Sequence, residues 1–129
     1  MTEVNIKSTD NTPEILLNPE GIIKIKGRAI DEKITKDYDQ IMNWIDAYLL
    51  NPAKFTEVII ALEYLNSYNT IILTSILKKI SLGILNGGKL IINWYYEEDD
   101  IDISDRGKYI SSTINVPIQF ILTDNIKYI

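Results

Sequence analysis

The segment from Phe55 to Leu65 constrains the fold more than any other part of the chain, because it is apolar and β-branched over most of its length. Val58, Ile59 and Ile60 follow one another without a polar interruption. A strand with apolar side chains on both faces belongs inside a sheet that is covered on both sides. The segment therefore predicts the central strand of an α/β domain.

Four other segments have the composition of strands. The first two are separated by the turn formers Asn-Pro-Glu-Gly, which predicts a hairpin. In its second strand Ile23 and Ile25 alternate with Lys24 and Lys26, so one face of this strand is expected to be buried and the other exposed to solvent. With the central segment included, strands are predicted over residues 14–17, 22–26, 55–65, 89–96 and 118–122.

Apolar residues recur at helical spacing in three segments that alternate with these strands. Trp44 and Tyr48 lie beside the apolar stripe of the first, where they either extend the core or form a docking patch. Gly87 and Gly88 are expected to end the second, and Gly107 interrupts the weak pattern of the third. Helices are therefore predicted over residues 35–50, 70–86 and 104–113.

The resulting order is ββαβαβαβ, which implies a mixed sheet of about five strands with about three crossover helices against it. The 129 residues, 46% of them hydrophobic, fit one globular domain over residues 1–129. Its polar start, residues 1–11, is expected to be a loose N-terminus.

Charge and hydropathy limit the partners of the chain. A net charge of −5 and a pI near 4.7 disfavour nucleic acid and anionic membranes, because phosphate groups are held chiefly by clustered Lys and Arg. No apolar run approaches the ~20 residues that span a bilayer, and the N-terminus lacks the features of a signal peptide. We expect a cytoplasmic protein that binds another protein.

Cys and His are absent from the chain, which removes disulfides, thiolate nucleophiles, typical zinc sites and the usual proton-transfer side chain. The acidic run after residue 96 fits no EF-hand. A loop counted from Asp100 has Asp105 where Gly is required, and a loop counted from Asp102 has Thr113 where Glu is required. The acidic run reads instead as a solvated loop that leads into the third helix. We expect no enzyme, no metal and no cofactor.

The junction between the central strand and the second helix is the candidate functional site. Ser67 follows Asn66 there, and a hydroxyl at a helix start lies among unpaired N–H groups that favour a phosphate. Asn and Ser in this position also act as plain N-caps, and that alternative stays open. Tyr64, Asn66 and Tyr68 are candidate partner contacts, although Tyr64 is expected to be buried in the strand.

A set of short motifs spans nearly the whole chain. They are Thr12-Pro13-Glu14, Gly27-Arg28, Trp44 with Tyr48, Tyr64-Leu65-Asn66-Ser67, Gly87-Gly88-Lys89, Asn93-Trp94-Tyr95-Tyr96-Glu97-Glu98-Asp99-Asp100 and Val116-Pro117. In this order and spacing they resemble the SiaC-type family of bacterial regulatory phosphoproteins. The resemblance implies a fold similar to STAS domains, the class of anti-sigma-factor antagonists, and an adaptor whose phosphorylation decides its partner.

The resemblance also implies a site and its partners. Ser67 matches the phosphorylated position of the family, which follows a Leu-Asn pair. Relatives continue with small Ser residues, whereas this chain has Tyr68 and Asn69, so Thr70 is a second candidate acceptor. The implied partners are a Ser/Thr kinase, a metal-dependent phosphatase and, in some systems, a diguanylate cyclase activated by the unphosphorylated form.

Two other classes of function stay open from the sequence. One is a constitutive scaffold that binds a partner without a covalent switch. The other is a small enzyme that uses Glu63 and the acidic run, which would require carboxylates to converge in a pocket.

Overall fold

The computed structural model describes residues 1–31, 35–84 and 88–129, which form one six-stranded sheet, three α-helices and a short 3-10 helix. The elements in chain order are β1 (Val4–Ile6), β2 (Glu14–Asn18), β3 (Ile22–Ala29), α1 (Thr35–Leu50), β4 (Phe55–Leu65), α2 (Ser67–Gly83), β5 (Lys89–Tyr96), α3 (Ile101–Ile114), β6 (Gln119–Leu122) and η1 (Ile126–Tyr128).

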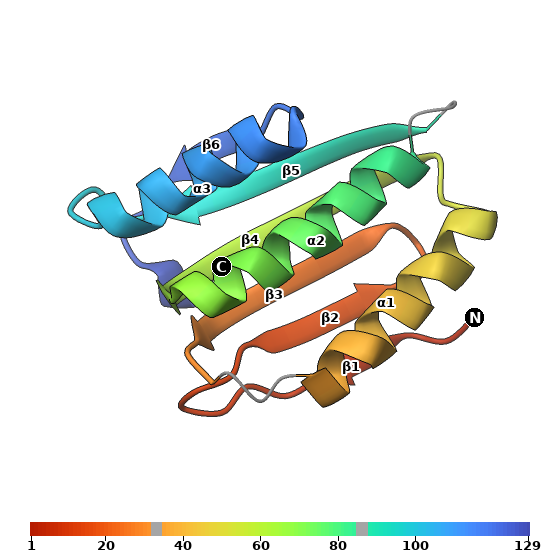
Figure 1. The fold of residues 1–129 in the computed structure, drawn as a ribbon, viewed down its shortest axis with the longest axis horizontal. Helices are drawn as coiled ribbons and strands as arrows, with labels where there is room; N and C mark the ends of the chain where they lie inside the picture. The colour runs from red at the N-terminus through yellow and green to blue at the C-terminus, as the bar shows by residue number, and fades with distance from the viewer. Residues whose placement is uncertain (32–34, 85–87) are drawn as a thin grey trace.

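The strands lie in the sheet in the order of the chain. β1, β2 and β3 pair antiparallel, whereas β3, β4, β5 and β6 pair parallel. Each parallel pair is joined through one helix, and such crossovers are almost always right-handed. Because the three crossovers advance in the same direction, α1, α2 and α3 cover the same face of the sheet (Figure 1). The predicted mixed sheet with three helices is confirmed.

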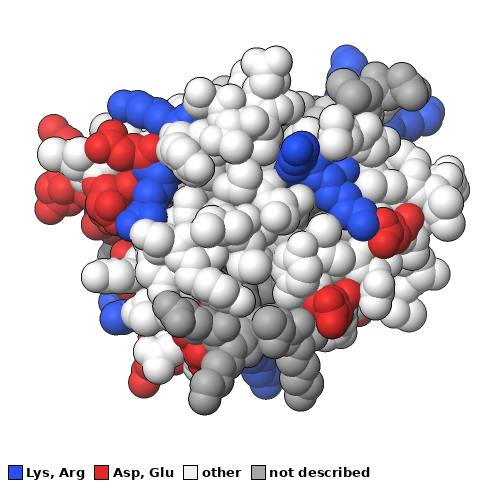
Figure 2. All heavy atoms as spheres, viewed as in Figure 1, with Lys and Arg blue, Asp and Glu red and all other residues white. Residues whose placement is uncertain are grey.

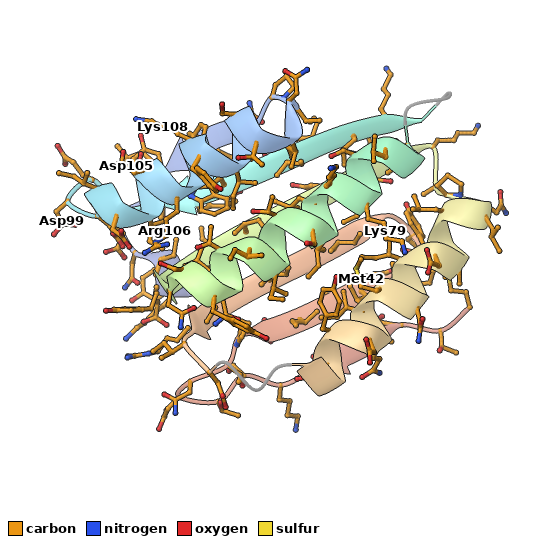
Figure 3. The ribbon with its side chains drawn as sticks, in the orientation of Figure 1. Met42, Lys79, Asp99, Asp105, Arg106 and Lys108 are labelled. Carbon is orange, nitrogen blue, oxygen red and sulfur yellow. The ribbon has the colours of Figure 1, made fainter. Side chains whose placement is uncertain are left out.

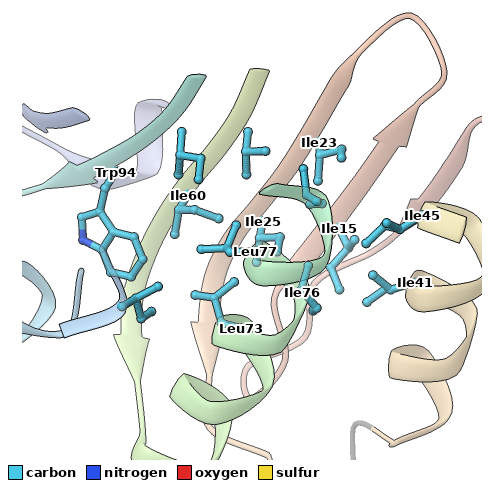
Figure 4. Packing of buried hydrophobic residues seen from close by; sticks show 14 of the residues in the cluster. Ile15, Ile23, Ile25, Ile41, Ile45, Ile60, Leu73, Ile76, Leu77 and Trp94 are labelled. Carbon is cyan, nitrogen blue, oxygen red and sulfur yellow. The ribbon is translucent and has the colours of Figure 1, made fainter. Parts of the chain in front are cut away.

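The core lies between the sheet and this helical layer. Ile23 and Ile25 of β3 and Ile60 of β4 share it with Leu73 and Leu77 of α2 (Figure 4). The alternation predicted for the second hairpin strand is confirmed, since Ile23 and Ile25 are buried whereas Lys24 and Lys26 are only half-buried.

The opposite face of the sheet departs from the prediction of cover on both sides. In the described part of the chain only η1 crosses it, where Lys24 Nζ donates to the carbonyl of Ile129 (2.7 Å) and Lys26 Nζ to that of Lys127 (2.7 Å). Ile22 and Ile91 remain 38% exposed on this face. The apolar run of the central strand therefore reflects an interior position in the sheet, not a third layer.

Trp44 and Tyr48 extend the core, and the docking-patch alternative is wrong for them. Both side chains are buried, and their rings stack with centroids 5.1 Å apart. The hydroxyl of Tyr48 shares a buried hydrogen bond with Thr56 Oγ1 (2.7 Å), and Trp44 Nε1 donates to the carbonyl of Thr2 (3.0 Å).

The expectation of a loose N-terminus over residues 1–11 is wrong for Val4–Ile6, which forms β1 at the edge of the sheet. Asn5 pairs with Leu16 of β2 in this ladder. Three residues are too short a run to give a periodic signal, so β1 is defined by its neighbour and not by its own sequence.

Two helices differ in their limits from the prediction. α2 begins earlier, at Ser67, and ends at Gly83, while the predicted stop at Gly87 falls outside the described residues. α3 begins at Ile101, because the side chain of Asp100 accepts a hydrogen bond from the N–H of Ile103 (3.1 Å). The acidic run is thus the loop and cap of a helix, as predicted.

α3 continues through Gly107, which the sequence marked as an interruption. A Cβ at this position would lie 2.7 Å from Cε1 of Phe120 and 2.7 Å from Cε2 of Trp94. Trp94 is fully buried and donates its Nε1 hydrogen to the carbonyl of Ile103 (3.1 Å). Glycine therefore allows α3 to approach β5 and β6 closely.

Gly107→Ala is expected to lower the free energy of unfolding by about 1–3 kcal/mol, because the added methyl group overpacks against the indole. At an exposed helical position the same change would stabilise by about 1 kcal/mol. Urea unfolding gives the sign, and Ser112→Ala, at an exposed position of α3, is the control with a change within about 0.5 kcal/mol. A stabilised Gly107→Ala protein would contradict the close packing of α3.

Candidate functional site

The junction between β4 and α2 is held by Asn66, the N-cap of the helix. Its Oδ1 accepts from the N–H of Asn69 (2.9 Å), and its Nδ2 donates to the carbonyl of Ile30 (2.7 Å). The N-cap interpretation is therefore confirmed for Asn66, whereas Ser67 is the first residue of the helix itself.

Asn69 ties the same turn to the end of β3. Its side chain is 2% exposed, and Nδ2 donates to the carbonyls of Ala29 (3.1 Å) and Asp31 (3.2 Å). The start of α2 is thus fixed on two sides by amide groups, before any partner or modification is present.

Ser67 is exposed at this fixed helix start. Within the part of the chain that the structure describes, no hydrogen bond involves its hydroxyl. The N–H groups of Ser67 and Tyr68 belong to the first turn, where a helix supplies no acceptor of its own. A negative group attached to Ser67 would therefore meet free donors and the positive end of the helix dipole.

Thr70, the second candidate, occupies a different environment. It is 5% exposed, and its hydroxyl donates to the carbonyl of Asn66 (2.7 Å). The same oxygen accepts from Nη1 of Arg106 (3.0 Å). Its hydroxyl is engaged within the fold, unlike that of Ser67.

Arg106 of α3 is part of the site, although no pattern in the sequence connects it with Ser67. Its Nε pairs with Oδ2 of Asp102 (3.1 Å) one turn earlier on the same helix. Figure 3 shows Arg106 on the side of α3 that faces the first turns of α2, with Lys108 on the opposite side. The neighbouring Gly107 indicates that this part of α3 packs closely. It does not indicate which element α3 packs against.

Ser67 and Arg106 together line two adjoining hollows on the surface. The first, of about 490 Å³, is completed by Glu63, Tyr64, Leu65, Asn66, Asp100, Asp102 and Ile103. The second, of about 380 Å³, lies between α2 and α3 and is completed by Thr70, Ile71, Asp105 and Tyr109. Among the predicted contacts, Tyr64 and Asn66 thus lie beside Ser67, while Tyr68 is half-buried and lines neither hollow.

The expected burial of Tyr64 is wrong, since its side chain is 55% exposed. The registered pairs of β4 with β5 run only from Phe55 to Ile60, whereas Tyr64 pairs with Arg28 of β3. The end of β4 therefore extends beyond one of its neighbours, and Tyr64 loses the cover that a central strand would give. Ile71 and Tyr109 are also exposed, at 65% and 59%.

Charge is unevenly distributed on this side of the molecule. Figure 2 shows acidic side chains gathered at the edge where α3 begins, whereas the middle of the helical face is largely uncharged. Within residues 1–31, 35–84 and 88–129, no three acidic groups are arranged to hold a metal ion. Nor does any helix of these residues have the length and apolarity needed to cross a bilayer.

Asn66→Ala is expected to lower the free energy of unfolding by about 1–2 kcal/mol, because the cap of α2 and the bond to Ile30 are lost together. Ser67→Ala is the matched control and should change it by less than about 0.5 kcal/mol. Chemical denaturation of both variants checks this. A larger effect at Ser67 than at Asn66 would reverse the assignment of the cap.

Comparison with known proteins agrees with this architecture. The apo form of SiaC from Pseudomonas aeruginosa superposes with a TM-score of 0.80 at 19% identity, over 95% of this chain and 99% of that one. SiaC in its complex with the diguanylate cyclase SiaD, from the same organism, gives a TM-score of 0.83 at 18% identity, over 93% and 99% of the two chains.

A further structure, described as SiaC of Pseudomonas aeruginosa, gives a TM-score of 0.78 at 18% identity and covers 95% of this chain and 98% of that one. The search of curated proteins gives no significant match. A family model described as SiaC family regulatory phosphoprotein matches residues 6–123, nearly the whole sheet and all three helices. The chain belongs to the SiaC family of regulatory phosphoproteins.

Proposed function

We propose that this chain is a phosphorylation-controlled adaptor and that Ser67 is its phosphoacceptor. The observation that carries the proposal is the position of Ser67, whose exposed hydroxyl has no partner within the described residues and stands at the capped start of α2. Membership of a family of regulatory phosphoproteins supports the type of modification. The role is that of a regulator and not of an enzyme.

The modification is chemically simple at this place. A Ser/Thr kinase transfers the γ-phosphoryl group of ATP to Ser67 Oγ, so an O–P bond forms while ADP and the hydroxyl proton leave. A metal-dependent phosphatase hydrolyses the ester and restores the hydroxyl. The product carries about −1.5 to −2 charges at neutral pH. Free N–H groups of the first turn accommodate this charge without refolding of α2.

Ser67 is preferred over Thr70 as the acceptor. Kinases require an accessible hydroxyl, and Thr70 is buried with its oxygen bonded to Asn66 and Arg106. Phosphorylation of Thr70 would break both bonds and push α3 away from α2.

The partner that we propose is a diguanylate cyclase, bound in the unphosphorylated state. A solved structure with the same fold is the complex of the cyclase SiaD with its activator SiaC, which supports this class of partner. The binding surface contains Ser67 together with the exposed apolar groups Tyr64, Ile71 and Tyr109, with Asn66 and Tyr68 at its side. A phosphate dianion among these groups would repel acidic groups of the partner and would lose its hydration under a packed interface. Both effects weaken binding, and the partner is released. These partners would meet the chain in the cytoplasm.

Phosphosite mapping on protein from its native cell is the first test of this proposal. Ser67 is expected to be modified, and the unmodified protein is expected to co-purify with a cyclase. A protein without phosphate at Ser67 under all growth conditions would instead be a constitutive scaffold.

Ser67→Asp is expected to weaken binding to the co-purified partner at least about tenfold, or about 1.4 kcal/mol, whereas Ser67→Ala retains wild-type affinity. The reason is the added charge within the contact surface. Calorimetry with purified partner measures the effect, and Ser112→Asp, at an exposed position of α3 outside both hollows, is the control for added charge. Equal affinity of wild type, both Ser67 variants and the phosphorylated protein counts decisively against the mechanism.

A further inference from the structure

We propose that Arg106 is the intramolecular receptor of the phosphate on Ser67, so that phosphorylation draws the start of α2 and the first turns of α3 together through one guanidinium group. This inference rests on the proposed function, because it concerns the phosphorylated form of Ser67. It names a residue of the same chain, Arg106, that binds the phosphate once Ser67 carries it.

Thr70 lies between Ser67 and Arg106 and shows that the guanidinium reaches the start of α2. Ser67 and Thr70 are three positions apart on α2, and side chains at this spacing are neighbours, with about 5–6 Å between their Cβ atoms. Nη1 of Arg106 already lies 3.0 Å from Thr70 Oγ1. A phosphate on Ser67 extends towards this group, because Ser67 and Arg106 line the same two hollows.

The present partners of Arg106 are weaker than a phosphate. Asp102 is 67% exposed in its side chain, and an exposed ion pair of this kind contributes about 1 kcal/mol or less. The hydroxyl of Thr70 is neutral. A phosphate dianion offers three acceptor oxygens to the planar fork of an arginine, which binds such groups through two parallel hydrogen bonds. The guanidinium can therefore turn to the phosphate while its backbone stays in place.

The other charged groups of the two hollows oppose a phosphate. The carboxylates are Glu63 at the end of β4, Asp100 at the cap of α3, and Asp102 and Asp105 within α3. Among the described residues that line these hollows, Arg106 is the one cation, and Lys127 of η1, outside them, pairs with Glu63 (3.8 Å). Without Arg106, the described charged groups that line the two hollows would all repel a dianion on Ser67.

The result of this contact is a change in the surface between α2 and α3. Ile71 and Tyr109 line the hollow there, and both are exposed in the unmodified protein. A phosphate held by Arg106 fixes a charged, hydrated group between them. The partner would then be released because the phosphate occupies the hollow between α2 and α3, as well as by charge repulsion.

Protein with phosphoserine incorporated at position 67 by genetic encoding, which needs no kinase, allows a direct test. The second pKa of the phosphate, near 6 in free phosphoserine, is followed by ³¹P NMR over a pH titration. A nearby cation favours the dianion and lowers this pKa, whereas carboxylates raise it. Arg106→Gln is therefore expected to raise the second pKa of the phosphate by about one pH unit.

Lys108→Gln is the matched control, because it removes the same charge from the same helix on the side that faces away from α2. It should leave the pKa of the phosphate within about 0.2 pH units of wild type, as expected for a distant, screened charge. Arg106→Lys keeps the charge without the fork and should give an intermediate value. Circular dichroism establishes that each variant is folded.

Equal titration of the Arg106→Gln and Lys108→Gln proteins would overturn the receptor role of Arg106. The same phosphoproteins, tested for affinity to the co-purified partner, separate this outcome from the proposed function. Loss of partner binding with an unchanged pKa leaves Ser67 as a switch and removes Arg106 from it. An altered pKa with unchanged partner binding retains the contact and removes the switch.

Discussion

Two asparagine side chains, Asn66 and Asn69, hold the start of α2 against the end of β3, and the exposed position of Ser67 depends on them. Their amides contact the carbonyls of Ala29, Ile30 and Asp31 and also bond to each other. The N–H of Asn69 and the carbonyls that follow β3 are thereby paired within the protein. The hydroxyl next to them is therefore presented to solvent by a rigid turn.

Under the proposed function, this rigidity would let a small covalent change at Ser67 act on a partner. A flexible loop could move a phosphate out of the contact area, whereas Ser67 lies in the first turn of a capped helix that packs on the sheet and would hold the phosphate there. The sheet topology adds to this constraint, because three crossovers of the same hand bring α2 and α3 side by side on one face. The groups that surround Ser67 thus come from β4, α2 and α3 at once.

Long segments with a strong pattern could be predicted from the sequence. The limits of β4, β5 and α1 agree with the prediction, because β-branched runs and helical periodicity persist over eight residues or more. β1 could not be found, since three residues carry no period. The exposure of Tyr64 depends on where β5 stops, and the contact of Arg106 with Thr70 depends on how two helices pack; neither is encoded locally.

The glycine at position 107 links the interior of the protein to its chemistry at the surface. It lets α3 rest on the indole of Trp94, and the next residue towards the N-terminus is Arg106. The anchor point of the guanidinium is thus set by contact with a buried ring, and only its own rotamers decide its reach. Under the proposed role of Arg106, a substitution in the hydrophobic interior at this point would alter the contact with the phosphate while every residue around Ser67 stays unchanged.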